Sequence, residues 1–164
     1  MLIEGTLIKG YAGFYYVYAD GRVWECSLRG RFRVKKQDFI PGDRVMILPG
    51  SGNKATIEQV LERRNSLVRP YVANVDQAFL VLARKKPDPD FCLLDRLLVQ
   101  AGRVGLEIII IFTKADLIEN VDDAQIKYYH SIGYKVINIS NKTKEGIQDV
   151  INLVKGHITV LAGP

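Results

Sequence analysis

An uninterrupted apolar run of four isoleucines and Phe112 is followed directly by a mainly polar segment, formed by Thr113, Lys114, Ala115 and Asp116. Apolar residues without alternation are typical of a strand that is buried on both faces, as in a parallel sheet covered by helices. Such sheets bind ligands beyond the carboxyl ends of their strands. The run therefore predicts a central parallel strand that carries these four residues to the ligand-binding edge of a sheet.

The four residues match the pattern Asn/Thr-Lys-x-Asp, which reads guanine in GTPases. An aspartate in this pattern can accept hydrogen bonds from N1–H and from the 2-amino group of guanine, while the lysine stem packs over the base. Adenine lacks that pair of donors, so a charge-assisted bidentate hydrogen bond separates the two bases. The alternative is an ordinary loop in which Asp116 caps a helix.

Positive charge is concentrated in the first part of the chain. Residues 1–70 hold 12 Lys and Arg against 7 Asp and Glu, whereas residues 71–164 hold 11 of each. The net charge of +5 therefore comes entirely from the first part. This asymmetry predicts two modules, which we place at residues 1–69 and 70–164.

Cysteine and histidine are sparse and scattered. Cys26 and Cys92 form no Cys-x-x-Cys pair, and His130 and His157 are isolated, so no disulfide framework or metal site is expected within these residues. No apolar run approaches the roughly 20 residues that span a bilayer, and the N-terminus lacks the pattern of a signal peptide. We expect a cytoplasmic protein without a membrane partner.

The sequence pattern of the first module predicts five short strands separated by turns, and Asp20-Gly21 is a strong hairpin signal. Five strands in about 60 residues predict a small closed barrel, either an OB-fold or an SH3-like barrel. The long third connection, residues 29–42, favours the OB-fold, whose face and loops commonly bind oligonucleotides. The expected strands cover residues 2–8, 14–19, 22–28, 43–48 and 55–61.

The third connection of the barrel carries the densest basic cluster of the chain. In an extended segment, alternate residues share one face about 6.5 to 7 Å apart, close to the phosphate spacing of a nucleic-acid strand. We therefore expect nucleic-acid contact here, although basic residues also protect edge strands from aggregation. Tyr11, Phe14, Tyr16 and Trp24 are either stacking surfaces or barrel core. The basic cluster consists of Arg29, Arg31, Arg33, Lys35 and Lys36.

Strand and helix patterns alternate through the second module, which predicts a parallel sheet with right-handed crossovers. We expect Asp88 to cap the first helix, with Pro89 at its first position and leucines on its buried side. The expected strands are residues 77–83, 107–112, 135–139 and 158–162, and the expected helices are residues 89–104, 121–132 and 145–155.

This register brings two further loops to the edge that carries Asp116. Ser140, Asn141 and Lys142 form Ser-x-Lys, the second guanine-reading element of GTPases, one helix and one strand after the first element. In that element the middle residue offers a backbone N–H to guanine O6, and the serine supports the aspartate. The third loop contains Gly163 and Pro164, which follow the last strand as the start of a phosphate loop would.

Base-reading loops that precede a phosphate loop reverse the usual GTPase order. The chain resembles the circularly permuted GTPases and, within them, the ribosome small subunit-dependent GTPase A family. Thr113 departs from the usual asparagine of the first element. The residues that carry the resemblance are 13–17 (GFYYV), 29–33 (RGRFR), 42–43 (GD), 69–70 (RP), 74–77 (NVDQ), 94–96 (LDR), 113–116 (TKAD) and 140–142 (SNK).

The resemblance implies an N-terminal five-stranded OB-fold that binds the small (30S) ribosomal subunit and 16S rRNA, followed by an incomplete P-loop GTPase-type parallel sheet with flanking helices. It further implies a cytoplasmic bacterial enzyme that hydrolyses GTP to GDP with Mg²⁺ late in subunit assembly. Separately from the resemblance, we expect a monomer. In the family, the rest of the phosphate loop, the switches and a Zn²⁺-binding domain come later in the sequence, and they are not among these 164 residues.

No catalytic residue is therefore expected within this span, and residues 1–164 alone should have negligible GTPase activity. The alternative is a non-catalytic RNA-binding scaffold with a vestigial nucleotide-binding module.

Overall fold

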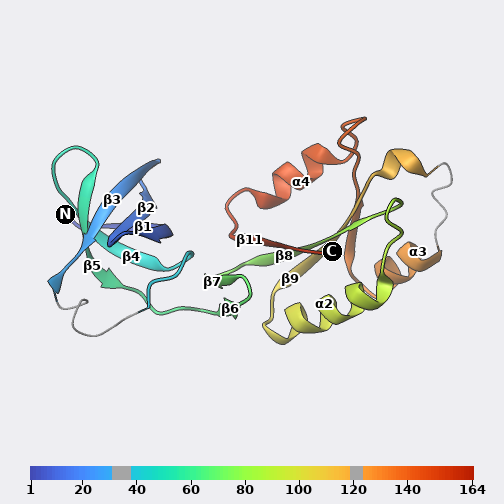
Figure 1. The fold of residues 1–164 in the computed structure, drawn as a ribbon, viewed down its shortest axis with the longest axis horizontal. Coiled ribbons are helices and arrows are strands. Elements are labelled where there is room, and N and C mark those ends of the chain that lie inside the picture. Colours follow the sequence, from blue (N-terminus) through green and yellow to red (C-terminus); the bar gives the residue numbers. More distant parts are fainter. Residues whose placement is uncertain (31–37, 119–123) are drawn as a thin grey trace. The chain divides into compact units, whose positions relative to one another are not determined.

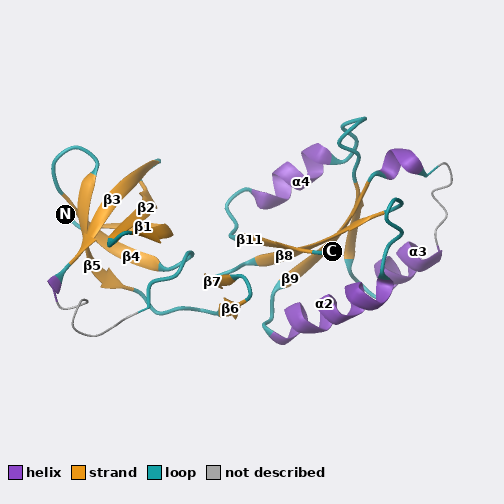
Figure 2. Cartoon of the chain, viewed as in Figure 1, coloured by secondary structure: helices purple, strands orange, loops and turns teal. Residues whose placement is uncertain are grey.

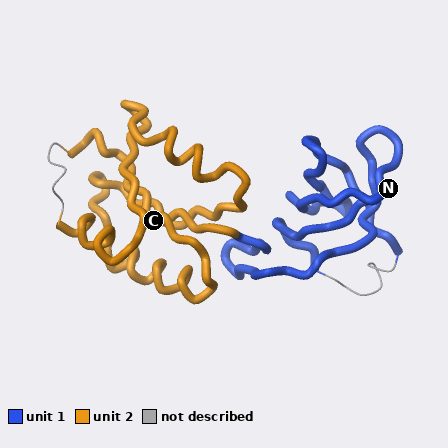
Figure 3. The backbone as a smooth tube through the Cα atoms, turned by 180° about the vertical axis from the view of Figure 1, so that it is seen from behind, with its two compact units in different colours: residues 1–75 blue, residues 76–164 orange. Residues whose placement is uncertain are grey.

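The computed structural model describes residues 1–30, 38–118 and 124–164. The chain divides into two compact units, Met1–Val75 and Asp76–Pro164, which Figure 3 colours separately. The expected boundary near Arg69 lies six residues before this division, inside a short hairpin, and as a domain boundary it stays a prediction. No helix in the described ranges is both long and apolar enough to cross a membrane.

The first unit contains a closed barrel with the strand order β1-β2-β3-β5-β4 (Figure 1). Strands β3 and β5 pair in parallel, and the other pairs are antiparallel. The OB-type barrel predicted from the sequence is therefore confirmed, with each strand end within three residues of its expected place. The strands are β1 (Ile3–Tyr11), β2 (Phe14–Ala19), β3 (Arg22–Leu28), β4 (Arg44–Pro49) and β5 (Lys54–Val60).

Inward-facing residues alternate along the barrel strands and form a closed apolar core that includes Leu7, Val17, Trp24, Val45 and Ile57. Each of these side chains is at most 3% exposed. Alternation with outward polar residues follows from the two-residue period of a strand. The aromatic and β-branched composition of these segments therefore produces a half-buried strand rather than a helix.

A polar network connects the barrel to the residues that follow it, where the polar and basic segment 62–70 predicts a linker. Asp43 is fully buried and accepts hydrogen bonds from Nε of Arg63 at 2.6 Å and from the backbone N of Ile40 at 2.9 Å. The side chain of Asn65 bonds both backbone groups of Val75, at 2.9 and 2.8 Å. The bonds of Asn65 close the base of an antiparallel hairpin formed by β6 (Ser66–Val68) and β7 (Tyr71–Ala73). The backbone N of Ala73 donates a 2.8 Å hydrogen bond to the carbonyl of Pro41, which connects the hairpin to the segment before β4.

The second unit is a parallel sheet with the strand order β10-β9-β8-β11 and helices on both faces (Figures 1 and 2). This arrangement confirms the predicted parallel sheet with flanking helices. The strands are β8 (Gln77–Ala83), β9 (Glu107–Thr113), β10 (Lys135–Asn138) and β11 (Thr159–Ala162). The helices are α2 (Phe91–Arg103), α3 (Ala124–Ser131), α4 (Ile147–Val154) and the 3₁₀ helix η1 (Ala115–Leu117).

The apolar run in β9 lacks alternation because the strand is covered on both sides. Ile110 and Phe112 pack in one cluster with residues of α2 and α3. Ile109 and Ile111 pack in a second cluster, to which α4 contributes. Figure 1 shows α4 on one side of the sheet and α2 with α3 on the other.

Two helix details differ from the sequence expectation. Asp90, not Asp88, caps α2, because its Oδ1 accepts a hydrogen bond from the backbone N of Leu93 at 2.9 Å. In α4, the helical spacing of Ile147, Val150, Ile151 and Val154 predicts one buried stripe, but Ile151 is 43% exposed and Val154 is 39% exposed. Leu153 packs against the sheet instead, together with Ile147 and Val150.

Candidate functional site

The two loops predicted to read guanine meet at the carboxyl ends of β9 and β10. These strands are adjacent and parallel, with Phe112 opposite Asn138. Beyond them, the Ser140 hydroxyl donates a hydrogen bond of 2.6 Å to Oδ1 of Asp116. Ser140 is completely buried, whereas Asp116 is exposed. Ser140 therefore fixes one carboxylate oxygen of Asp116, while the aspartate side chain remains accessible to solvent.

Ser140 also organises its own loop. Its Oγ accepts hydrogen bonds from the backbone N atoms of Lys142 at 3.2 Å and Thr143 at 3.1 Å. The hydroxyl therefore uses its proton on Asp116 and its lone pairs on the turn. This arrangement leaves Asn141 and Lys142 exposed at the tip of the loop.

The loop that contains Asp116 has a specific backbone conformation. Lys114 has φ 59° and ψ 39°, a left-handed conformation, and precedes the 3₁₀ helix η1. The backbone N of Ala115 donates a 3.1 Å hydrogen bond to the carbonyl of Ile139, which connects this loop to the end of β10. Asp116 lies inside η1 and not at its N-cap, so the alternative in which Asp116 caps a helix is wrong.

Strand β8 and the loop that follows it bond the side chains of Thr113 and Lys114. The Lys114 ammonium donates a hydrogen bond to the carbonyl of Lys86. The hydroxyl of Thr113 donates to the carbonyl of Leu82 at 3.3 Å. Sequence reasoning missed the role of Lys86, because a backbone carbonyl carries no side-chain signal.

Arg84 is a second residue that sequence reasoning missed. It follows β8 directly and is only 7% exposed, and its Nη1 donates a hydrogen bond to Oδ1 of Asn138 at 3.0 Å. Its guanidinium carbon lies 5.9 Å from the centre of the Phe112 ring. Arg84 also lines a cavity of about 140 Å³ together with Ala115, Ile118, Asn138 and Glu145. A basic residue immediately after a buried strand was the available sequence signal.

Gly163 and Pro164 lie after β11, which pairs with β8 and not with β9. Gly163 passes very close to β8, since an added Cβ would lie 2.1 Å from the carbonyl oxygen of Val81. The two residues are therefore at the same edge of the sheet as Asp116, but β8 separates their strand from β9.

The basic cluster of the barrel is only partly within the described residues. Arg29 forms an ion pair with Glu58 and keeps 58% of its side chain exposed. Arg31, Arg33, Lys35 and Lys36 lie outside the described residues.

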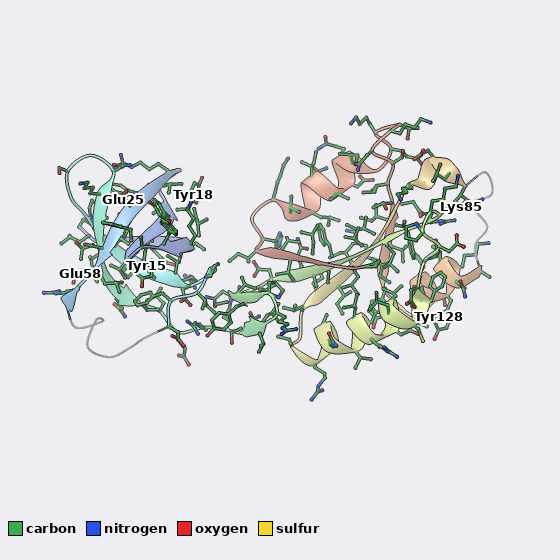
Figure 4. All side chains as sticks on the ribbon, viewed as in Figure 1. Tyr15, Tyr18, Glu25, Glu58, Lys85 and Tyr128 are labelled. Carbon is green, nitrogen blue, oxygen red and sulfur yellow. The ribbon has the colours of Figure 1, made fainter. Side chains whose placement is uncertain are left out.

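Among the aromatic candidates on the barrel, Trp24 is core and Tyr11 and Phe14 are 75% and 48% exposed. Lys9 lies 4.8 Å from the centre of the Tyr16 ring, which is half-buried. Tyr18, which was not among the candidates, is 52% exposed on the same strand as Tyr16 and is labelled in Figure 4. The barrel therefore exposes several aromatic rings, and one half-buried ring, Tyr16, lies beside a basic side chain.

The described residues contain no group of three or more His, Cys, Asp or Glu side chains that could hold a metal ion. Burial raises the pKa of the Cys26 thiol from 9.0 to about 11, so this cysteine is protonated at neutral pH.

The fold and the order of its elements define the class of circularly permuted GTPases. A solved structure described as YjeQ from Thermotoga maritima matches all of this chain and 61% of its own chain, with a TM-score of 0.90 and 32% identity. A second, described as YloQ, a circularly permuted GTPase, matches all of this chain and 60% of its own, with a TM-score of 0.89 and 36% identity.

The chain belongs to the RsgA GTPase family, whose family model matches residues 60–164, and the model of the RsgA N-terminal domain matches residues 4–57. A relative from Moorella thermoacetica, named small ribosomal subunit biogenesis GTPase RsgA, is 44% identical over 162 residues. A relative of the same name from Clostridium novyi is 39% identical over 163 residues. The chain spans 56% of the length of each relative.

Proposed function

We propose that this chain supplies the guanine-binding loops and the RNA-binding barrel of a GTPase that acts in the biogenesis of the small ribosomal subunit. The 2.6 Å hydrogen bond between Ser140 and Asp116 carries the proposal, because it joins two loops that are far apart in sequence into one base-reading site. The family match and the names of the relatives support the biological context.

Each residue of the site has a defined task in this proposal. The Asp116 carboxylate accepts hydrogen bonds from N1–H and the 2-amino group of guanine, and Ser140 keeps that carboxylate oriented. The Lys114 stem, held at its end by the carbonyl of Lys86, covers one face of the base. The backbone N–H of Asn141 faces guanine O6. Thr113 uses its hydroxyl within the protein, so the discrimination between bases depends on Asp116.

The barrel binds ribosomal RNA in this proposal. The net positive charge of the chain comes from its first part, and Tyr11 and Phe14 expose rings on which unpaired bases can stack. Contacts between basic residues and phosphates release counterions, so this binding weakens as salt rises.

GTP hydrolysis is assigned to the complete protein, in the cytoplasm, with Mg²⁺ supplying charge neutralisation at the phosphates. The motif Gly-x-x-x-x-Gly-Lys-Ser/Thr does not occur in residues 1–164. Gly163 and Pro164 correspond in this proposal to the first turn of the phosphate loop. Residues 1–164 on their own therefore hydrolyse no GTP at a measurable rate.

Small subunits provide the test of this function with the complete natural protein that carries this chain. A sedimentation assay compares binding to 30S subunits with GDP and with a non-hydrolysable GTP analogue, and a phosphate-release assay runs in parallel. Tighter binding with the GTP analogue and subunit-stimulated hydrolysis are expected. Equal binding to 30S subunits with GDP and with the GTP analogue, without stimulated hydrolysis, would instead support an RNA-binding scaffold.

A further inference from the structure

We propose that Arg84 is a positioning residue for guanine discrimination. It fixes the loop that contains Asp116 and the loop that contains Ser140 relative to each other. Arg84 is not expected to touch the base itself. The inference rests on the proposed function, because the property that it explains is the preference of the site for guanine.

Arg84 connects the ends of three neighbouring strands. Its backbone N, directly after β8, donates a 2.9 Å hydrogen bond to the carbonyl of Thr113 at the end of β9. Its side chain then passes the ring of Phe112 and bonds to Asn138, the last residue of β10. The strand order β10-β9-β8 means that this one residue spans the width of the base-reading edge.

Asn138 is followed by Ile139 and then by Ser140, the residue that orients Asp116. The next residue, Ile139, donates its backbone N to the carbonyl of Phe112 at 2.8 Å and accepts from Ala115 at 3.1 Å. Ser140, which follows, bonds Asp116. A shift of Asn138 therefore moves both Ile139, which bonds Ala115, and Ser140, which bonds Asp116.

The chemistry of Arg84 favours a positioning role over simple packing. A buried charge is costly unless it is hydrogen-bonded, and apolar residues of similar size often stabilise a core equally well. A guanidinium offers several donors in a rigid plane, so it can fix an acceptor in one orientation. The cavity of about 140 Å³ that Arg84 shares with Ala115 lies where the loop would relax if the guanidinium were removed.

The test measures a ratio of affinities in the complete natural protein. Competition binding gives the dissociation constants of GDP and of IDP, whose hypoxanthine base lacks the 2-amino group that Asp116 is proposed to bind. The ratio is independent of the fraction of folded protein, so a loss of stability alone leaves it unchanged. The variants are Arg84→Met, Arg84→Lys and the control Arg103→Met, which removes an exposed guanidinium at the end of α2.

Arg84→Met should lower the preference for GDP over IDP about tenfold, as expected when a hydrogen bond to a charged group is misaligned. Arg84→Lys should restore part of the preference, because it keeps the charge without the planar fork. Arg103→Met should leave the preference unchanged. An unchanged ratio in Arg84→Met would overturn the positioning role, even if the variant is less stable.

A second pair of variants addresses the acceptor and does not depend on folding of the arginine variants. Asn138→Leu removes the acceptor and should reproduce the loss of preference, whereas Asn138→Asp keeps an acceptor and should retain it. Equal ratios in both variants would overturn the inference. Failure of the unmodified protein to prefer GDP over IDP would refute the proposed guanine site itself, which is a different result from a silent Arg84.

Discussion

The hydroxyl of Ser140, which is fully buried, donates a 2.6 Å hydrogen bond to the exposed carboxylate of Asp116. The two residues are 24 positions apart in sequence and follow adjacent strands. This bond orients a carboxylate toward solvent before any ligand arrives. Preorganisation of this kind lowers the entropic cost of binding a ligand.

Ser140→Ala removes the donor to Asp116 and the acceptor of two backbone N–H groups. We expect GDP affinity to fall roughly thirtyfold, which corresponds to about 2 kcal/mol for a hydrogen bond to a charged group. Isothermal titration of the complete protein measures the change. Ser131→Ala, at an exposed serine whose hydroxyl donates to the carbonyl of Tyr128 within α3, is the matched control and should bind GDP normally. Equal affinities in the two variants would contradict the role of Ser140.

Gly42→Ala should destabilise the first unit far more than a typical glycine substitution. Gly42 has φ +88°, and an added Cβ would lie 1.9 Å from the carbonyl oxygen of Ala73 in the hairpin. Gly52→Ala is the control, because Gly52 also has positive φ (+66°) but has nothing within 4 Å of the added atom. Thermal unfolding should show a loss of about 1 kcal/mol for Gly52→Ala, the cost of the backbone conformation alone. Similar losses for both variants would contradict the close approach at Ala73.

The two cysteines should differ sharply in reactivity. Cys92 is exposed, whereas Cys26 is buried in the barrel core. Burial raises the pKa of the Cys26 thiol to about 11, so the nucleophilic thiolate forms only at strongly alkaline pH. Brief treatment with iodoacetamide at pH 8, followed by peptide mass spectrometry, should label Cys92 and leave Cys26 unmodified until the protein is unfolded. Rapid labelling of Cys26 in the native protein would show that the barrel core is open.

Neutralising the basic cluster should weaken RNA binding and reduce its salt dependence. Replacing Arg31, Arg33, Lys35 and Lys36 with Gln removes up to four positive charges that can pair with phosphates. The slope of log affinity against log salt for 30S subunits should then fall by about 1 for each phosphate that is no longer neutralised. The charge-matched control replaces Lys127, Lys135, Lys144 and Lys155, exposed lysines of the second unit. An equal effect of both sets would indicate that total charge, and not the barrel, determines binding.

Local patterns predicted most of the fold because each element carries its own signal. β2, β3 and β8 begin and end at the expected residues, since apolar and aromatic runs and the Asp20-Gly21 turn mark them. The predicted start of α2 was two residues too early because Asp88 and Asp90 both flank Pro89. Only the backbone geometry decides which of the two carboxylates reaches the backbone N of Leu93. Periodicity also placed Ile151 on the buried stripe of α4, although the helix turns Leu153 toward the sheet.

The candidate site was predictable where it consists of short motifs and not where it depends on long-range contacts. The elements of Asp116 and Ser140 are recognisable tetrapeptide and tripeptide patterns. The bond of Arg84 to Asn138 joins residues 54 positions apart, and no local pattern reports such a pair. The carbonyl of Lys86 that holds Lys114 belongs to the backbone, which every residue type provides.

The nucleotide preference of Asp116→Asn tests the central claim most directly. The amide of asparagine presents a donor to the 2-amino group of guanine but can bond the 2-oxo group of xanthine. In the complete protein, GDP affinity should fall by about a hundredfold or more and XDP should become the preferred ligand, since unpaired polar groups at a binding site are strongly penalised. Asp149→Asn, an exposed carboxylate in the first turn of α4, should leave the guanine preference intact. An Asp116→Asn protein that still prefers GDP over XDP would contradict the assignment of this site.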